Sequence, residues 1–200
     1  MKIHNYTNLK DEELVKLYVE TQSNLYFEEI YKRYADKVYR KCYSFVYNQE
    51  KAEDFTHDIF LKLIFKIGTF KENSKFSTWL YSITYNYCMD QIRVNKKEAK
   101  VPLSDNFDLE DQDDDDEIIS MQTSGLNKSL QKMPSDEKAL LLMKYQDDFS
   151  LKDIAETLNI SESAVKMRLL RSKEKLRKLY LENIAIAGLI IIKILLFWRK

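Results

Sequence analysis

Residues that break regular structure are scarce in this chain, which has only three glycines and two prolines among its 200 residues. Strand-rich folds need a turn every few residues, and turns draw heavily on glycine and proline. Apolar residues make up 44% of the sequence, which is enough to build packed cores. The chain is therefore predicted to be all-α, with long helices joined by few loops, and its length suits one ordinary domain or two small ones.

The N-terminal half has the apolar spacing of buried helix faces. Apolar residues recur at three- and four-residue steps through residues 25–46 and again through residues 52–67. The polar, basic stretch 69–77 predicts a loop, with Ser77 or Thr78 as the N-cap of a third helix that ends near residue 95. These helices predict a small N-terminal bundle.

Charge is unevenly distributed, although the formal net charge is zero. Residues 1–100 carry 17 basic and 14 acidic side chains, residues 101–117 carry no basic and 9 acidic ones, and residues 118–180 carry 12 basic and 8 acidic ones. The acidic strip repels itself and cannot bury enough apolar area to offset the entropy of ordering, which predicts a flexible linker. It lacks the spacing, the mid-loop glycine and the terminal glutamate of an EF-hand, which disfavours a calcium site.

Beyond the linker the sequence predicts short helices, and the last two have the spacing of a helix-turn-helix. Ser150 and Asp153 form a candidate capping box for the first helix of this pair. Ser161 is placed to cap the second helix after a tight turn. The predicted parts are a segment of residues 1–24, a helical bundle of residues 25–97, an acidic flexible linker of residues 98–125, a helix-turn-helix domain of residues 126–180, and an apolar tail of residues 181–200.

The last helix of the pair has two distinct faces when it is plotted at about 100° per residue. Val165, Leu169, Ser172 and Leu176 fall on the inward face. Ser163, Met167, Leu170 and Arg171 fall on the opposite face, between two rows of cations. A DNA major groove suits this second face, since apolar groups meet thymine methyl groups, arginine reads guanine and cations hold phosphates. A basic amphipathic helix that binds other protein is the alternative. The predicted DNA-binding residues are Ser163, Lys166, Met167, Arg168, Leu170, Arg171, Lys173 and Lys175.

The loop of residues 71–76 and the helix after it also mix aromatic and basic side chains. This mixture suits unstacked bases as well as phosphates. Most aromatic residues at helical spacing belong to a core, so a purely structural role is the alternative for each of them. Phe76 and Trp79 are the candidate aromatic contacts that adjoin the loop.

Three segments in order resemble the bacterial RNA polymerase sigma factors, and most of all their small extracytoplasmic-function (ECF) group. They are AEDFTHDIFLKLI at 52–64, KFSTWLYSITYNYCMDQIR at 75–93, and FSLKDIAETLNISESAVKMRLLRSKEKLR at 149–177. The resemblance covers roughly residues 25–179 and includes a linker of the family's length. It implies a subunit that directs the polymerase to promoters and helps to melt the minus-ten element. It also implies that the chain is no enzyme and needs no cofactor or metal.

The resemblance also assigns residues to surfaces. It implies that Lys166, Met167, Leu170 and Arg171 read the minus-thirty-five element, and that His57 is a surface residue. The core-polymerase contacts that it implies are Asp54, Asp58, Phe60 and Leu63. The minus-ten contacts, which the loop and the third helix supply together, are Lys71, Asn73, Ser74, Lys75, Phe76, Trp79, Asn86, Arg93, Lys96 and Lys97.

Two other classes of protein remain to be compared. A stand-alone helix-turn-helix regulator, whose N-terminal half senses a ligand or dimerises, is the alternative function. A helical carboxylate metalloenzyme is disfavoured because His4 and His57 supply no Glu-x-x-His pairs. The two cysteines have no metal-site spacing and no secretory signal opens the chain, which predicts a cytoplasmic protein.

The linker and the tail allow several interpretations. In this family the linker threads the polymerase's nucleic-acid channel, so its carboxylates are expected to imitate a phosphate backbone, with a plain spacer as the alternative. The apolar residues 184–198 would span about 22 Å as a helix, less than a hydrocarbon core of about 30 Å. They predict docking on a membrane surface, on an inhibitor protein or on the chain's own domains, more than a full span. The expected partners are core RNA polymerase, promoter DNA and an anti-sigma factor.

Overall fold

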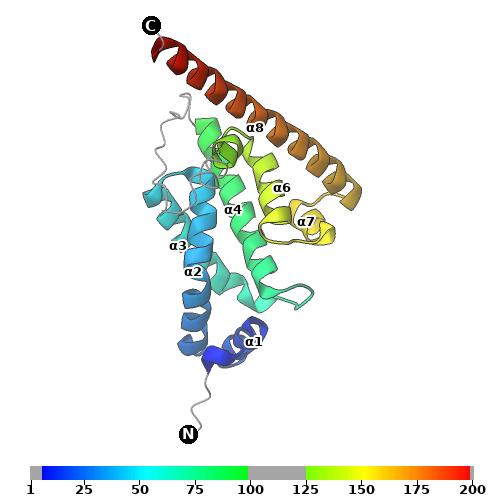
Figure 1. The fold of residues 1–200 in the computed structure, drawn as a ribbon. Helices are drawn as coiled ribbons and strands as arrows, with labels where there is room; N and C mark the ends of the chain where they lie inside the picture. Colours follow the sequence, from blue (N-terminus) through cyan, green and yellow to red (C-terminus); the bar gives the residue numbers. More distant parts are fainter. Residues whose placement is uncertain (1–5, 99–124, 199–200) are drawn as a thin grey trace. The chain divides into compact units, whose positions relative to one another are not determined.

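The computed structural model describes the backbone of residues 6–98 and 125–198 and the side chains of residues 6–94 and 125–185. Every regular element in these residues is helical, which confirms the all-α prediction (Figure 1). The chain divides into two compact units, Met1–Asp105 and Asn106–Lys200. The greater part of the predicted acidic linker lies outside the described residues.

Helix α2 is the centre of unit 1, because it packs against each of the other three long helices of this unit. It buries Ile30, Tyr34, Val38 and Cys42, which are four residues apart and so share one face. The elements of unit 1 are the 3-10 turn Tyr6–Asn8, α1 (Asp11–Thr21), α2 (Asn24–Val46), α3 (Gln49–Lys66), the 3-10 turn Ile67–Thr69 and α4 (Phe76–Glu98).

The N-terminal segment belongs to this unit through a cluster of polar contacts on α2. Arg33 forms an ion pair with Asp11 at 2.7 Å and donates hydrogen bonds to the carbonyl oxygens of Thr7 and Leu9. The Tyr34 hydroxyl donates to the other oxygen of Asp11 at 2.5 Å. Burial, together with this carboxylate, raises the pKa of Tyr34 far above its ordinary value. Residues 6–11 are therefore held against α2.

The start of α4 differs from the prediction. The helix begins at Phe76, and the Phe76 amide donates to a carboxylate oxygen of Glu12 in α1 at 2.9 Å. The prediction of Ser77 or Thr78 as the N-cap is wrong, because a side chain distant in sequence satisfies the exposed amide. This contact fixes the end of the loop of residues 71–76 to α1.

Unit 2 contains the predicted helix-turn-helix. Its core holds Met143, Phe149, Ile154 and Val165, all of them almost fully buried. The Lys144 ammonium donates to the Phe149 carbonyl oxygen at 3.0 Å and so closes the connection that precedes the pair. The elements of unit 2 are a helical segment of residues 125–131, α6 (Ser135–Tyr145), α7 (Leu151–Leu158) and α8 (Glu162–Trp198).

Helix α8 is longer than predicted, since it continues past residue 180 to Trp198 as one helix (Figure 1). Asn183 fastens the first part of this extension to the 125–131 segment, because its amide donates to Ser129 Oγ and accepts from Lys132 Nζ, both at 2.8 Å. The helix therefore does not end at residue 180, as the sequence predicted, but continues into the segment that was assigned to the apolar tail. Among the residues that the structure describes, no helix combines the length and the apolarity that crossing a bilayer requires.

Candidate nucleic-acid and protein interfaces

Three local devices set the ends of the helix pair: one at the start of α7, and two in the turn between α7 and α8. Ser150 and Asp153 form the predicted capping box, in which each side chain accepts a hydrogen bond from the other's backbone amide at 3.0 Å. Asn159 ends α7 in the left-handed conformation, which asparagine tolerates well. Ser161 Oγ accepts from the Ala164 amide at 3.2 Å and caps α8. The two predicted caps, at Ser150 and at Ser161, are thus confirmed, and Asn159 adds a C-cap that the sequence analysis did not identify.

The inward stripe predicted for α8 is confirmed. Val165, Leu169 and Ser172 are buried and Leu176 is half-buried, whereas Met167 and Leu170 are 51% and 50% exposed. Two exposed apolar side chains on one helix face, with cations beside them, make a surface that water solvates poorly. All eight residues predicted to bind DNA on this helix are exposed, namely Ser163, Lys166, Met167, Arg168, Leu170, Arg171, Lys173 and Lys175.

Two of these cations also contact their own domain. Lys175 forms an ion pair with Glu137 of α6 at 3.1 Å, and the Lys173 ammonium lies 5.9 Å from the centre of the Tyr145 ring. Both contacts are on the protein surface, where ion pairs contribute little to stability and exchange readily. These two cations are therefore oriented beside the exposed face of α8 but can still turn towards a phosphate.

The loop before α4 rests on an aromatic cluster. Phe70, Phe76 and Trp79 pack with ring centres 5.4 to 6.0 Å apart. Within the loop, Glu72 has a φ of 55°, the left-handed region that few residues other than glycine adopt. An aromatic anchor at each end, half-buried Phe70 and buried Phe76, and a strained residue between them hold a short polar loop in one shape at the protein surface.

The predicted minus-ten residues fall into four groups. Phe76 is 0% exposed and packs against Tyr34 and Phe70, so its side chain is part of the core and we withdraw it as a direct base contact. Ser74 and Trp79 are half-buried, and the side chains of Lys96 and Lys97 lie outside the described part of α4. The exposed ones are Lys71, Asn73, Lys75, Asn86 and Arg93.

Helix α3 presents a different set of side chains from the predicted one. Asp54 and Asp58 are exposed as expected, but Phe60 is only 4% exposed and Leu63 is fully buried. Phe60 packs against the Tyr31 ring at 4.6 Å, so we withdraw Phe60 and Leu63 as contacts for a partner. Their burial follows from helix phase, which places them on the same side as the core residues of α3.

Sequence reasoning missed the exposed apolar residues on this helix, of which Leu61 and Phe65 are the most exposed. They are 56% and 85% exposed. Steps of four, three and four residues lead from Asp54 to Asp58, Leu61 and Phe65, so the four side chains form one stripe along α3. A helical wheel of residues 49–66 would have found this stripe. We call it the α3 stripe, acidic at its N-terminal end and apolar at its C-terminal end.

Asp58 is also tied to the core of unit 1. The Tyr87 hydroxyl of α4 donates a short hydrogen bond to the Asp58 carboxylate. Burial and this carboxylate raise the pKa of Tyr87 well above its ordinary value. The Lys62 ammonium lies 4.4 Å from the centre of the Tyr87 ring. Asp58 is therefore held in one position on the α3 stripe.

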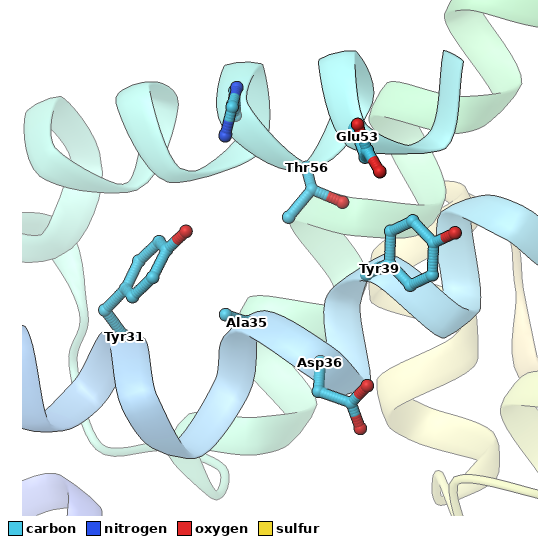
Figure 2. Close-up of a pocket in the computed structure, with 7 residues that line it drawn as sticks. Tyr31, Ala35, Asp36, Tyr39, Glu53 and Thr56 are labelled. Carbon is cyan, nitrogen blue, oxygen red and sulfur yellow. The ribbon is translucent and has the colours of Figure 1, made fainter. Parts of the chain in front are cut away.

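A hollow of about 270 Å³ lies beside the α3 stripe, between α2 and α3. Figure 2 shows Tyr31 and Tyr39 on α2 at its two ends, with Glu53 above Tyr39 on α3. Asp36 at the edge already pairs with Arg40 at 3.0 Å, in an exposed contact. Tyrosine rings and carboxylates together suit a guanidinium or ammonium group. The lining residues are Tyr31, Ala35, Asp36, Tyr39, Glu53, Thr56 and His57.

Unit 2 has an apolar groove of its own, of about 400 Å³. Residues of the 125–131 segment, α6 and α8 line it, and Leu126 and Tyr145 are exposed at its rim. Its walls are leucine-rich and carry one cation, Lys173. The residues that line it are Leu126, Leu130, Leu141, Leu142, Tyr145, Gln146, Lys173 and Leu176. This groove has the character of a protein-binding surface, and sequence reasoning did not identify it.

The described side chains include no group of three or more histidine, cysteine, aspartate or glutamate residues placed to hold a metal ion. His57 is exposed on α3, where the sequence placed it as a surface residue. The candidate binding surfaces described above are one cationic helix face, one basic loop, one acidic and apolar stripe, and the two depressions beside α3 and in unit 2.

Comparison with known proteins identifies both units. Sigma-70 region 2 matches residues 30–98, and sigma-70 region 4 matches residues 126–176. The ECF RNA polymerase sigma factor SigW of Bacillus subtilis is 34% identical over 163 residues, which cover 76% of this chain and 87% of that relative. The ECF sigma factor SigM of Mycobacterium tuberculosis is 25% identical over 154 residues, or 76% of each chain.

Solved structures agree in fold. The sigma factor RpoE of Bartonella quintana, solved in complex with the anti-sigma factor NepR, aligns with a TM-score of 0.60 at 19% identity, over 76% of this chain and 95% of that one. CnrH, solved in complex with the cytosolic domain of CnrY, aligns with a TM-score of 0.60 at 18% identity, over 84% of this chain and 96% of that one.

Proposed function

The chain belongs to the ECF group of bacterial RNA polymerase sigma factors and acts in transcription initiation, and from this we propose how its surfaces divide the work. The observation that supports the division best is the exposed face of α8, where cations flank Met167 and Leu170 on the second helix of a helix-turn-helix. Sequence-specific DNA binding is the use that suits such a face. We assign this face to the minus-thirty-five element.

The loop of residues 71–75 and the exposed face of α4 would bind the minus-ten element. Lys71 and Lys75 supply positive charge, and Asn73 supplies both a donor and an acceptor for a base edge. Trp79 is half-buried beneath the loop and can stack on a base without leaving the aromatic cluster. Extruding a base costs a few kcal/mol, and a preformed loop offsets part of that cost. Melting of the minus-ten element is thus assigned to unit 1.

The α3 stripe would bind core RNA polymerase. Asp54 and Asp58 attract a cationic surface, and Leu61 and Phe65 provide apolar area that is otherwise left in water. The hollow beside the stripe contains Glu53 and two tyrosines and offers a place for a cationic side chain of the same partner. The polymerase performs the chemistry in this assignment, and the chain itself is not an enzyme.

Binding to DNA with and without core polymerase tests this assignment against the stand-alone regulator. A sigma factor is expected to bind promoter fragments poorly alone and firmly as holoenzyme. The experiment is a gel-shift with purified chain, core polymerase and both together, followed by mapping of transcript starts. Tight sequence-specific binding by the chain alone, with no new start points in the presence of core, would favour the regulator.

The linker, the tail and an inhibitor complete the proposal. We infer from composition that the acidic linker occupies a nucleic-acid channel of the polymerase. We also infer that the chain is cytoplasmic and that an anti-sigma factor inhibits it there. The apolar residues 184–198 would dock on a membrane surface or on such an inhibitor. Deleting residues 184–200 and measuring the fraction of chain that is bound to polymerase in cells distinguishes regulatory docking from an inert end.

A further inference from the structure

The only two cysteines of the chain lie side by side in the core of unit 1. Cys42 is on α2 and Cys88 on α4, both are fully buried, and their Sγ atoms are 3.8 Å apart. They are 46 positions apart in sequence, so the fold alone brings them together. A disulfide needs about 2.05 Å between the sulfur atoms. Small side-chain rotations and a slight approach of the two helices would close this gap.

We propose that Cys42 and Cys88 are an oxidation site, at which a hydroperoxide closes a disulfide that joins α2 to α4. One sulfur, as the thiolate, attacks an oxygen of hydrogen peroxide; the O–O bond breaks, and the departing hydroxide takes up the released proton to become water. The second sulfur then displaces the hydroxyl of the sulfenic acid, which leaves with the second thiol proton as water. Two thiols lose two electrons and two protons, and one peroxide becomes two waters.

The surroundings of the pair favour Cys42 as the attacking sulfur. The hydrogen bond from Cys88 lowers the pKa of the Cys42 thiol, whereas the same hydrogen bond and burial raise the pKa of Cys88. The nucleophile in such reactions is the thiolate. Since both sulfurs are buried, a small uncharged oxidant must enter during local opening of the α2 and α4 contact. Oxidation is therefore expected to be slow and selective for small peroxides.

The fold controls the equilibrium between the disulfide and the two free thiols more directly than it controls the rate of oxidation. If the native fold holds the two sulfurs close, it favours the disulfide over the free thiols more than the unfolded chain does. By linkage, the disulfide then stabilises the native fold by the same factor. A tenfold preference corresponds to about 1.4 kcal/mol. The same proximity thus predicts both an easier disulfide and a higher melting temperature.

The test is an equilibrium measurement on the full chain in glutathione redox buffers, once under native conditions and once in denaturant. Free thiols are trapped by alkylation and counted by mass spectrometry. Because the chain has two cysteines only, an intramolecular disulfide can join only Cys42 to Cys88. We expect the disulfide to be favoured at least tenfold more in the native chain than in the unfolded chain, and to form with hydrogen peroxide and reverse with dithiothreitol.

The proposal would be overturned if the native chain favoured the disulfide no more than the unfolded chain does. It would also be overturned if peroxide gave mainly sulfinic acid or a disulfide-linked dimer. The oxidised full chain should also melt several degrees above the reduced one. Cys88→Ala is the matched control, because its melting temperature should not respond to the redox buffer. If that variant fails to fold, the equilibrium measurement on the unaltered chain still decides.

Discussion

At the scale of single residues, burial separates side chains that residue type alone cannot separate. Phe60 and Phe65 lie on one helix and have the same chemistry, yet one is 4% and the other 85% exposed. Met167 and Leu170 are apolar residues of a water-facing helix surface, and the structure leaves both of them half in water. Apolar side chains that remain in water add nothing to the stability of the free chain. Their exposure together on one helix face therefore indicates a binding surface.

The α8 face predicts different effects for its arginine and its lysine. Arg171→Ala should weaken holoenzyme binding at one promoter position, by about 1–3 kcal/mol, because arginine can read a base edge. Lys173→Ala should weaken binding to all sequences about equally and reduce its salt dependence, because we expect Lys173 to contact a phosphate. Binding of the two holoenzymes to a set of single-base promoter variants, at several salt concentrations, checks both. Equal loss on every variant for Arg171→Ala would contradict the base-reading role.

Lys138 predicts a pH dependence of stability in unit 2. This lysine is 5% exposed on α6, and burial lowers its pKa to about 8 from the ordinary value of 10.5. Between these two values the unfolded chain binds more protons than the folded one, so stability rises with pH. Relative to Lys138→Met, the wild-type chain should gain roughly 2–3 kcal/mol between about pH 7 and about pH 10.5. Urea unfolding at both pH values measures this.

Exposed Lys152 provides the control for that experiment. It forms a surface ion pair with Glu156 at 3.9 Å on α7. Lys152→Met should shift the free energy of unfolding by the same small amount at both pH values. If the difference between the wild-type chain and Lys138→Met were also constant with pH, the folded chain would keep Lys138 charged throughout and the prediction would fail.

At the scale of helices, sequence periodicity predicted the features that depend on one helix alone. It missed the features that depend on contacts between two helices. The inward stripe of α8 and the caps at Ser150 and Ser161 are local, and the structure confirms them. The start of α4 depends on Glu12 of α1, 64 residues away, which no local pattern contains. Phe76 was misplaced for the same reason, because a basic, polar neighbourhood in sequence gives no sign of the aromatic cluster that buries it.

Helix α3 allows a paired test of its two faces. Phe65→Ser should leave the stability of unit 1 nearly unchanged and weaken binding to core polymerase, because its ring lies in water in the free chain. Phe60→Ala should instead cost about 3–5 kcal/mol of unfolding free energy, because its ring packs in the core. Urea unfolding and titration with labelled core polymerase give both quantities. Unchanged polymerase binding by Phe65→Ser would remove Phe65 from the proposed interface.

Asp58→Arg serves as the reference variant for that interface. It reverses the charge at the acidic end of the α3 stripe and should impair assembly with core polymerase without changing the DNA preference of any holoenzyme that forms. If Asp58→Arg impairs assembly and Phe65→Ser does not, polymerase binds the acidic end of the stripe only. If neither variant has an effect, polymerase binds elsewhere on the chain.

At the scale of the whole molecule, charge is arranged so that two mildly basic stretches, residues 1–100 and 118–180, flank a strongly acidic segment. Residues 101–117 carry nine acidic and no basic side chains, in a chain of zero net charge. In the proposed division of work, each unit binds one promoter element, and neither surface alone binds both. The acidic segment joins these two surfaces, so it would lie near both DNA and polymerase. Its carboxylates would be repelled by the phosphates of DNA and attracted by a basic channel of the polymerase.

This arrangement predicts that the linker acts after promoter binding. Replacing Asp113, Asp114, Asp115 and Asp116 by asparagine keeps length and polarity and removes four negative charges. Promoter affinity of the holoenzyme should remain the same within error, whereas the ratio of short abortive transcripts to full-length transcripts should change, because the growing RNA competes with the linker for the channel. Permuting residues 105–117 without changing their composition is the matched control. If the asparagine variant leaves that ratio unchanged, the linker is a spacer whose charge has no part in early RNA synthesis. If the permuted chain alters the ratio as much as the asparagine variant does, the order of the linker residues matters along with their charge.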